Sequence, residues 1–501
     1  MVLRLQREAN LSAKHQGFFY QVSAVNAVKD LEYAAVFHEQ GLGKTKIGVD
    51  VALWWLDTGV ADSVLIVTKK GLIQNWSDEL KTHTHLFPRI LTQDRKNNFY
   101  AFNSPSRLYL THYETLISEQ KRLQLFLRTR KVGIILDEAH KIKNPDAGVA
   151  KALFALAPGF VRKIIMTGTP VANRPYDLWA QIFFLDGGES LGMNFKEFRR
   201  SLDLANELAF SPEKARVFQD NLSHVYGKIQ AFSVRETKDA LEIQLPNKVF
   251  RNLEVEMAWR QSELYNAVRV EFQLYVVKNN IAKLDESGEI LKRLLRLVQI
   301  ASNPKLVDES YQEIPAKFAV LEQLLFQIIE KEEKAIIWTS YTDNVSWLTR
   351  ELKQFGAVMV HGKLSYPERQ HSLTKFKNDP ETRVLIATPG SAKEGLTLTV
   401  ANHAIFYDRT FSLDDYLQAQ DRIHRISQTR TCYVTNLIAK DSIDEWIDVL
   451  LSAKHLAAQL AQGDIGQEEY ESNADYAFGE MIRELLNPTH NGVTNEQRNT
   501  D

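Results

Sequence analysis

The sequence predicts an α/β protein with two parallel-sheet lobes and a helical insertion between them. Short apolar runs of strand length alternate with helical periodicity in the first 188 residues, and this alternation returns after residue 310. Such alternation is typical of parallel sheets covered by helices. Strand-like runs are scarce between the two halves. The expected domains are a first lobe at 1–188, the insertion at 189–310, a second lobe at 311–470, and a C-terminal helix with a disordered tail at 471–501.

Bulk composition limits the partners. The net charge is −2 and the pI is about 6.7, so any contact with nucleic acid must be a local stripe rather than a field of the whole protein. Cys432 is the single cysteine, which excludes an internal disulfide and a multi-cysteine zinc site. No apolar run approaches the roughly 18 residues of a membrane span. We therefore expect a protein of the cytoplasm of a bacterial or phage-infected cell, without zinc or a membrane anchor. A monomer is the default expectation, because the sequence itself does not give the oligomeric state.

A phosphate-binding loop is predicted near the N-terminus. Residues 33–37 form an apolar strand, residues 38–45 a glycine-containing turn, and residues 46–56 a helix. The full pattern asks for a glycine five residues before Gly43, where His38 stands, so it is matched only from Gly43 onward. An ordinary helix start is the alternative, and the flanking strand and helix favour phosphate binding.

Each residue of this turn has an expected task at a bound nucleotide. The backbone N–H groups around Gly41, Leu42 and Gly43 would close around an anion. Lys44 would reach the outer phosphates, and Thr45 would hold Mg²⁺. The expected cofactors are therefore ATP and Mg²⁺.

Two adjacent carboxylates follow the apolar strand at residues 132–136. Asp137 would bind Mg²⁺, largely through water. Glu138 would orient and polarise the attacking water. An exposed acidic turn is the alternative, and the phosphate loop upstream disfavours it. Near the N-terminus, the amide of Gln21 can read an adenine edge, and a solvated helix residue is an equally good interpretation.

The most informative stretch of the second half is LDDYLQAQDRIHRISQ at residues 413–428. On a helix, Gln418, Arg422 and Arg425 stand at i, i+4 and i+7, which is one face. Two arginines on one face are what an arginine-finger arrangement needs, because guanidinium groups stabilise charge on the γ-phosphate when the lobes close. A pair of solvated arginines is the alternative, which the phosphate loop and the carboxylates disfavour.

A Thr-Gly-Thr-Pro turn follows the strand at residues 163–166. Its hydroxyls could link the nucleotide state to the other half of the molecule, although an ordinary tight turn also fits. The residues expected to couple the two halves are Thr167, Gly168, Thr169 and Gln418.

Taken together, these motifs resemble superfamily 2 helicases, and the Snf2-like group in particular, with small phage or bacterial members as the best match in layout. The matching stretches are Gln21 as the Q motif, HEQGLGKT at 38–45, LDEAHKIKN at 136–144, TGTPVANRPYDLW at 167–179, VRETKDALEIQLPNK at 234–248, LVQIASNPKL at 297–306, IIWTSYTDNVSWL at 336–348 and QAQDRIHRISQ at 418–428. The fifth motif, GSAKEGLTL at 390–398, looks closer to the annealing-helicase branch, and Ser427 replaces a usual glycine.

The resemblance implies two RecA-like lobes and an ATP-driven translocase that tracks on duplex, forked or branched DNA and remodels forks or junctions. The implied DNA contacts are Lys69, Lys70, Trp76, His112, Tyr113, Ser340, His361 and Gly395. For Lys69 and Lys70, a solvated turn is about as good an interpretation. Rival functions are a single-strand-tracking helicase, a DNA-tracking remodeller that displaces bound protein, and a nucleotide-gated DNA clamp. The presence of Glu138 and the two arginines disfavours the clamp.

Overall fold

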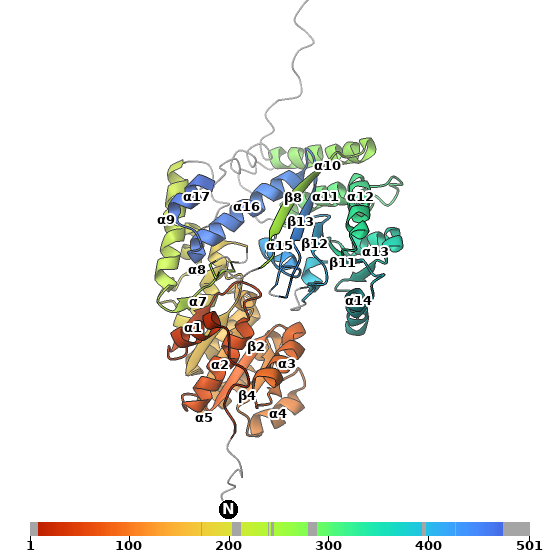
Figure 1. Cartoon of the computed structure of the whole chain (residues 1–501). Helices are drawn as coiled ribbons and strands as arrows, with labels where there is room; N and C mark the ends of the chain where they lie inside the picture. The colour runs from red at the N-terminus through yellow and green to blue at the C-terminus, as the bar shows by residue number, and fades with distance from the viewer. Residues whose placement is uncertain are drawn as a thin grey trace, which may run out of the picture.

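The computed structural model describes residues 9–171, 173–202, 212–238, 240–241, 245–278, 288–392, 397–425 and 427–473. Within them the chain forms two lobes, each built on one sheet with helices around it (Figure 1). The strands of each sheet pair in parallel with their neighbours. The predicted α/β class with two parallel-sheet lobes is therefore confirmed. In the described part of the chain, no helix combines the length and apolarity that crossing a bilayer requires.

The first lobe has a seven-stranded sheet in the order β3-β4-β2-β5-β6-β1-β7. Its strands are β1 (Tyr33–Val36), β2 (Ser63–Thr68), β3 (Arg89–Ile90), β4 (Leu108–His112), β5 (Val132–Asp137), β6 (Arg162–Met166) and β7 (Ser233–Val234). Its helices are α1 (Phe19–Val28), α2 (Lys44–Asp57), α3 (Ile73–His83), α4 (Arg95–Asn103), α5 (Tyr113–Thr129), α6 (Gly148–Leu156) and α7 (Trp179–Asp186). Every residue of β2, β4 and β5 is buried, as expected for central parallel strands covered on both faces.

The second lobe has a six-stranded sheet in the order β10-β11-β9-β12-β13-β8. Its strands are β8 (Lys248–Val255), β9 (Ala335–Trp338), β10 (Val358–Val360), β11 (Val384–Ala387), β12 (His403–Phe406) and β13 (Cys432–Ala439). Its helices are α12 (Ala316–Glu330), α13 (Thr342–Glu351), α14 (Tyr366–Asn378), α15 (Leu413–Gln420), α16 (Ile443–Gln462) and α17 (Gln467–Asn473). The remainder of the predicted tail at 471–501 lies outside the described residues.

The segment between the lobes is not purely helical, which corrects the prediction for residues 189–310. It contains α8 (Phe195–Ser201), α9 (Pro212–Ile229), α10 (Trp259–Lys278) and α11 (Gly288–Ser302). It also supplies β7 to the first sheet and β8 to the second. β8 pairs with β13 along its whole length, but most of its side chains are not buried. The sequence of β8 thus lacks the apolar run that usually indicates a buried parallel strand.

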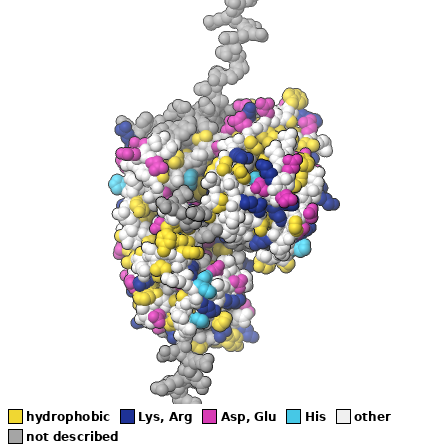
Figure 2. All heavy atoms as spheres, in the orientation of Figure 1, with side chains coloured by type: hydrophobic (Ala, Val, Ile, Leu, Met, Phe, Trp, Pro, Cys, Tyr) yellow, Lys and Arg dark blue, Asp and Glu magenta, His cyan; other side chains and the backbone are white. Residues whose placement is uncertain are grey.

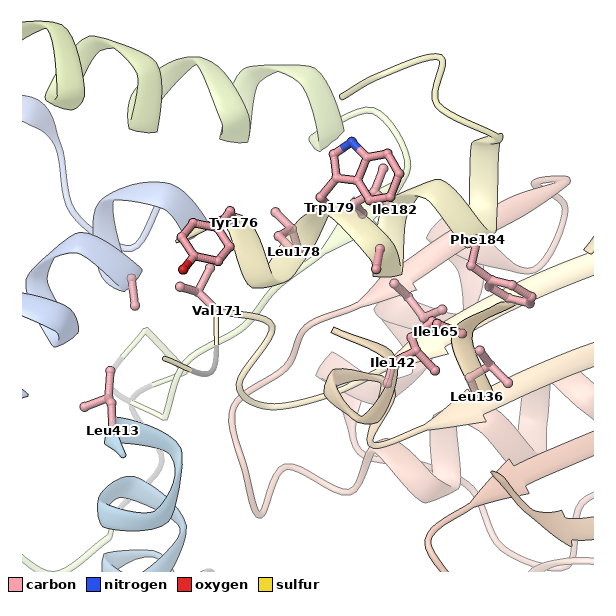
Figure 3. Close-up of a cluster of buried hydrophobic side chains, with 14 of the residues drawn as sticks. Leu136, Ile142, Ile165, Val171, Tyr176, Leu178, Trp179, Ile182, Phe184 and Leu413 are labelled. Carbon is pink, nitrogen blue, oxygen red and sulfur yellow. The ribbon is translucent and has the colours of Figure 1, made fainter. Parts of the chain in front are cut away.

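The apolar core of the first lobe continues into the second. One cluster of buried side chains includes Leu136, Ile165 and Phe184 of the first lobe and Leu413 at the start of α15. Figure 3 shows Leu413 at one end of this cluster, on the side of Val171 and Tyr176. Helix α16 begins after β13 of the second lobe and packs against α9 (Figure 1). The two lobes are thus in contact through packed side chains.

Candidate active site at the junction of the lobes

The predicted phosphate loop lies between β1 and α2. Gly41 and Gly43 have φ angles of 90° and 71°, a region that glycine adopts without a steric penalty, and Gly43 is the N-cap of α2. The ammonium group of Lys44 donates to the carbonyl oxygens of His38 and Glu39, at 2.8 and 3.2 Å. Burial lowers the pKa of Lys44 to about 8. In this arrangement the lysine rests on its own loop, beside the N-terminus of a helix suited to an anion.

Gln21 braces this loop from α1. Its side-chain Nε2 donates to the carbonyl oxygen of Leu42 at 3.1 Å, and its Oε1 accepts from the backbone N–H of Phe18 at 2.9 Å. The side chain is buried, so the interpretation of Gln21 as a solvated helix residue is wrong. Its contact with an adenine edge remains a prediction.

The two predicted carboxylates stand at the carboxyl end of β5. Burial and the neighbouring Glu138 raise the pKa of Asp137 to about 6, against the effect of its hydrogen bonds. Burial also acts to raise the pKa of Glu138, but Lys69, His140 and Lys44 together bring it below its ordinary value. Glu138 has a φ of 54°, a left-handed conformation that is costly for a residue with a Cβ. Such strain is typical of functional positions.

Two predicted DNA contacts, Trp76 and Tyr113, instead bond to Asp137, which is a correction. The indole N–H of Trp76 donates to Oδ2 of Asp137 at 2.7 Å, and the hydroxyl of Tyr113 donates to the backbone carbonyl of Asp137 at 2.7 Å. Both aromatic side chains are 0% exposed, so neither can touch a polymer on the surface. His112 is also largely buried, and its ring nitrogens bond Glu114 and Thr115; its contact with DNA stays a prediction.

The residues present fit a magnesium site completed by nucleotide and water. Thr68 and Trp76 both donate to Oδ2 of Asp137, and Oδ1 accepts no hydrogen bond from the described residues. Thr45 is the second residue of α2, directly after the phosphate loop. Among the described residues, no cluster of three or more His, Cys, Asp or Glu side chains could hold a metal. Magnesium commonly binds through one or two protein oxygens together with phosphate and water, so Asp137 and Thr45 would suffice.

A series of buried polar contacts crosses from the first lobe to the second. His140 contacts Oε2 of Glu138 at 3.2 Å and the hydroxyl of Thr167 at 3.2 Å. The hydroxyl of Thr169 donates to Oδ1 of Asp414 on α15 at 2.9 Å. The amide of Gln418, one turn along α15, donates to the same oxygen at 2.6 Å. The structure thus brings together three of the four predicted coupling residues.

Gly168, the fourth coupling residue, is held between two side chains of the phosphate loop. A Cβ added to it would lie 2.5 Å from Cγ of Gln40 and 3.1 Å from Nζ of Lys44. The close packing leaves no room for a larger residue. His140 and Asp414 were missed by the sequence reasoning. Each lies inside or beside a quoted motif, but only the fold shows that they meet.

Arg422 and Arg425 lie at this junction, on a different local structure from the predicted one. Helix α15 ends at Gln420, so the two arginines occupy the turns that follow rather than one helical face. Arg425 nevertheless approaches the phosphate loop, with its Cγ 3.8 Å from the position of a Cβ added to Gly41. Burial and Arg425 lower the pKa of Arg422 to about 10, and the carboxylate of Glu138 opposes this shift. The charge of Glu138 acts on Arg425 in the same sense.

Lys238 is a further junction residue that the sequence did not single out. It lies on the chain that crosses from β7 to β8, and its Nζ contacts Oε1 of Glu39 at 3.0 Å and Oδ1 of Asp421 at 3.4 Å. Burial would lower the pKa of Lys238, but Asp421 and Glu39 outweigh it and raise the value. The lysine therefore joins the phosphate loop of one lobe to the segment of the other lobe that carries the arginines.

The other predicted DNA contacts stay predictions. Lys69 contacts Nε2 of His140 at 2.7 Å, whereas the neighbouring Lys70 is exposed. Ser340 and His361 follow the carboxyl ends of β9 and β10 in the second sheet. His361 is buried and Ser340 is half-buried. Gly395 lies outside the described residues. Figure 2 shows acidic and basic side chains intermixed over the visible face, with several Lys and Arg side chains grouped on the second lobe.

One parallel-sheet lobe carries a phosphate loop and paired carboxylates, and the other lobe supplies two arginines. This arrangement is that of a two-lobe nucleoside triphosphatase. Residues 20–306 match the SNF2-related domain, and residues 316–427 match the helicase conserved C-terminal domain. The chain belongs to the SNF2 family, within the ATPases of helicase superfamily 2. The resemblance to Snf2-like helicases that the motifs indicated is confirmed.

Several curated proteins are similar to most of this chain. A putative ATP-dependent helicase/translocase, YwqA, of Bacillus subtilis is 28% identical over 86% of the chain and 47% of its own length. An uncharacterized ATP-dependent helicase of Mycoplasma pneumoniae is 28% identical over 85% of the chain and 40% of its own length. The mouse DNA annealing helicase and endonuclease ZRANB3 is 24% identical over 84% of the chain and 38% of its own length. The chain thus spans less than half the length of these relatives.

Among solved structures, the Sulfolobus solfataricus SWI2/SNF2 ATPase core domain is 25% identical, with a TM-score of 0.42. That alignment covers 97% of this chain and 98% of the other.

Proposed function

We propose that the chain hydrolyses ATP at the junction of its lobes and uses the cycle to translocate along DNA. The observation that carries this proposal is that Arg425 of the second lobe lies beside Gly41 of the phosphate loop, and that the charge of Glu138 acts on both Arg422 and Arg425. A site with charged groups from both lobes is complete only when the lobes are together. Hydrolysis and lobe movement are then linked by construction.

Each side chain has one task in the proposed reaction. On nucleotide binding, the ammonium of Lys44 leaves the carbonyls of His38 and Glu39 for the outer phosphates. Asp137, oriented by the hydrogen bond from Trp76, would hold Mg²⁺ together with Thr45, and the ion would supply positive charge beside the phosphates.

Glu138 accepts a hydrogen bond from the attacking water and orients it toward the γ-phosphate. The two guanidinium groups stabilise the charge on the transferring phosphoryl group, an effect worth roughly 10³-fold or more in rate.

The series of buried polar contacts would transmit the loss of the γ-phosphate to the second lobe. His140 touches both Glu138 and Thr167, and Thr169 reaches Asp414 at the start of α15. Loss of the γ-phosphate would change the charges around Glu138 and so weaken this chain of contacts. The lobes would then separate and shift their grip on phosphates, with Lys70, Ser340 and His361 as the proposed contact points. Binding of this kind is independent of sequence and weakens steeply with salt.

The proposed substrate is duplex or branched DNA, with movement of forks or junctions as the outcome. The name of one relative, a DNA annealing helicase, supports branched DNA, and the translocase named in Bacillus subtilis supports tracking. A single-strand-tracking helicase and a remodeller that displaces bound protein are the rivals. A triplex-displacement assay detects tracking on duplex, whereas a fork-unwinding assay detects strand separation.

The decisive experiment measures phosphate release against a panel of single strand, duplex, fork, four-way junction and RNA. The proposal predicts strong stimulation by duplex or branched DNA and little by RNA. Lys44→Ala and Glu138→Gln should abolish the stimulated rate, whereas Lys81→Ala, at an exposed lysine of the same lobe, should leave it unchanged. A Lys44→Ala or Glu138→Gln variant with full DNA-stimulated activity would refute the assignment.

A further inference from the structure

Gln40 is a buried polar residue of the phosphate loop that the mechanism above does not use. It immediately precedes Gly41, and the whole residue is 8% exposed. Its side-chain Nε2 is fully buried and has no hydrogen-bond partner among the described residues. An amide donor buried in this state is costly, because it gave up its bonds to water without replacement. An acceptor that arrives with the ligand would remove this cost.

The position of Gln40 indicates which part of a nucleotide would supply that acceptor. Cγ of Gln40 and Nζ of Lys44 both lie next to Gly168, 2.5 and 3.1 Å from the point where a Cβ on that glycine would stand. The amide nitrogen of Gln40 is two bonds away from Cγ. It therefore lies in the same region beside Gly168 as the ammonium of Lys44. Since Lys44 serves the outer phosphates in a loop of this kind, the amide of Gln40 is placed for them as well.

Gly168 fixes Gln40 in this place. The backbone nitrogen of Gln40 is also only 3.0 Å from the added Cβ, so the turn at residues 167–169 and the loop are in direct contact. This turn is the start of the path to Asp414 on the second lobe, through the hydroxyl of Thr169. A change in the position of Gln40 would therefore be felt by the turn that contacts the second lobe.

We propose that Gln40 donates a hydrogen bond to an oxygen of the γ-phosphate and so distinguishes a nucleoside triphosphate from a diphosphate. The inference deepens the proposed function and rests on it, because it needs a nucleotide in the loop. A diphosphate lacks the oxygen in question and leaves the amide without a partner. The triphosphate satisfies it and presses the loop against the turn at residues 167–169.

The experiment compares the affinities of a non-hydrolysable ATP analogue and of ADP, each with Mg²⁺, by calorimetry. Gln40→Met keeps the length of the side chain and removes the donor. A hydrogen bond to a charged phosphate corresponds to a loss of about 10- to 100-fold in affinity for the triphosphate. The affinity for ADP should stay within about 2-fold, because ADP never makes this bond.

Two further variants make the result specific. Gln40→Asn keeps an amide but retracts it by one carbon, and it should show the same selective loss. Gln181→Met is the matched control: Gln181 is buried nearby and donates to the carbonyls of Pro170 and Asp177, so its loss should lower stability without changing the ratio of the two affinities.

An equal loss of affinity for both nucleotides in the Gln40 variants, or no loss for either, overturns the role assigned to Gln40 and leaves the proposed function standing. A wild-type protein that binds neither nucleotide overturns the proposed function and this inference together.

Discussion

Replacing Trp76 by Phe tests the role that the fold gives to this side chain. The indole N–H of Trp76 donates to Oδ2 of Asp137 at 2.7 Å, and the ring is 0% exposed. Phenylalanine keeps most of the buried ring but removes the donor. One hydrogen bond to a charged group is worth about 1.5–3 kcal/mol. Its loss should raise the pKa of Asp137 further above about 6, by about 1–2.

The consequence is a pH-dependent loss of magnesium affinity. At pH 7 a larger share of Asp137 is protonated in the variant, and the proton competes with Mg²⁺, so the half-saturating Mg²⁺ concentration for ATPase activity should rise roughly 2- to 10-fold. Raising the pH to 9 deprotonates Asp137 in both proteins, and the difference should then nearly vanish.

A matched control separates this effect from general destabilisation. Trp55→Phe removes the N–H of another buried tryptophan in the same lobe, whose partner is the carbonyl of Lys29. It should lower stability without altering the magnesium dependence. A Trp76→Phe protein with unchanged magnesium dependence at pH 7, or with a selective loss of DNA affinity, would refute the reasoning and restore Trp76 as a DNA contact.

Three further predictions concern the junction and its surroundings. Lys238→Met removes the cation shared by Glu39 and Asp421, although Lys248 stays 3.6 Å from Asp421, so the cost is below the roughly 3–5 kcal/mol of a fully buried pair. KM for ATP should rise in this variant, whereas Lys238→Arg should largely preserve it. Equal KM values for the wild type and Lys238→Met would contradict the role of Lys238 in joining the phosphate loop to the second lobe. Burial lowers the pKa of Lys454 to about 8, so the folded protein holds this proton less tightly than the unfolded chain does. The free-energy cost of burying the charged ammonium therefore disappears as the pH rises from 8 toward 10.5. The free energy of unfolding of the wild type relative to Lys454→Met should therefore increase by at most about 3 kcal/mol over this range, measured with urea; a constant difference would contradict the assignment. Burial raises the pKa of the Cys432 thiol to about 11, so labelling by a thiol reagent should be at least about 100-fold slower in the folded protein than in denaturant; rapid labelling of the folded protein would contradict its burial.

The sequence predicts the two sheets well because most of their strands are continuous buried apolar runs. β2 and β5 are examples in which every residue is buried. The same logic fails for β8, which is mostly unburied and finds its place only by pairing with β13. Pairing between residues about 180 positions apart is a property of the fold, and no local pattern encodes it.

The site shows the same division between local and distant information. The phosphate loop and the pair Asp137 and Glu138 follow from local spacing, because backbone geometry alone brings such neighbours together. Whether Trp76 turns outward to a ligand or inward to Asp137 depends on how α3 packs on the sheet. Lys238 and Asp414 lie within quoted stretches, but their contacts arise only because the second lobe is docked on the first, so no local pattern reveals them.

The central claim is that each lobe supplies part of one catalytic centre. Single-turnover ATP hydrolysis by Arg422→Gln and Arg425→Gln tests it most directly, with Arg350→Gln, an exposed arginine of the same lobe, as the control. If both lobes contribute, the rate should fall roughly 10³-fold in at least one of the two junction variants, with ADP affinity retained and the control unchanged. Hydrolysis within about tenfold of the wild type in both junction variants would contradict it.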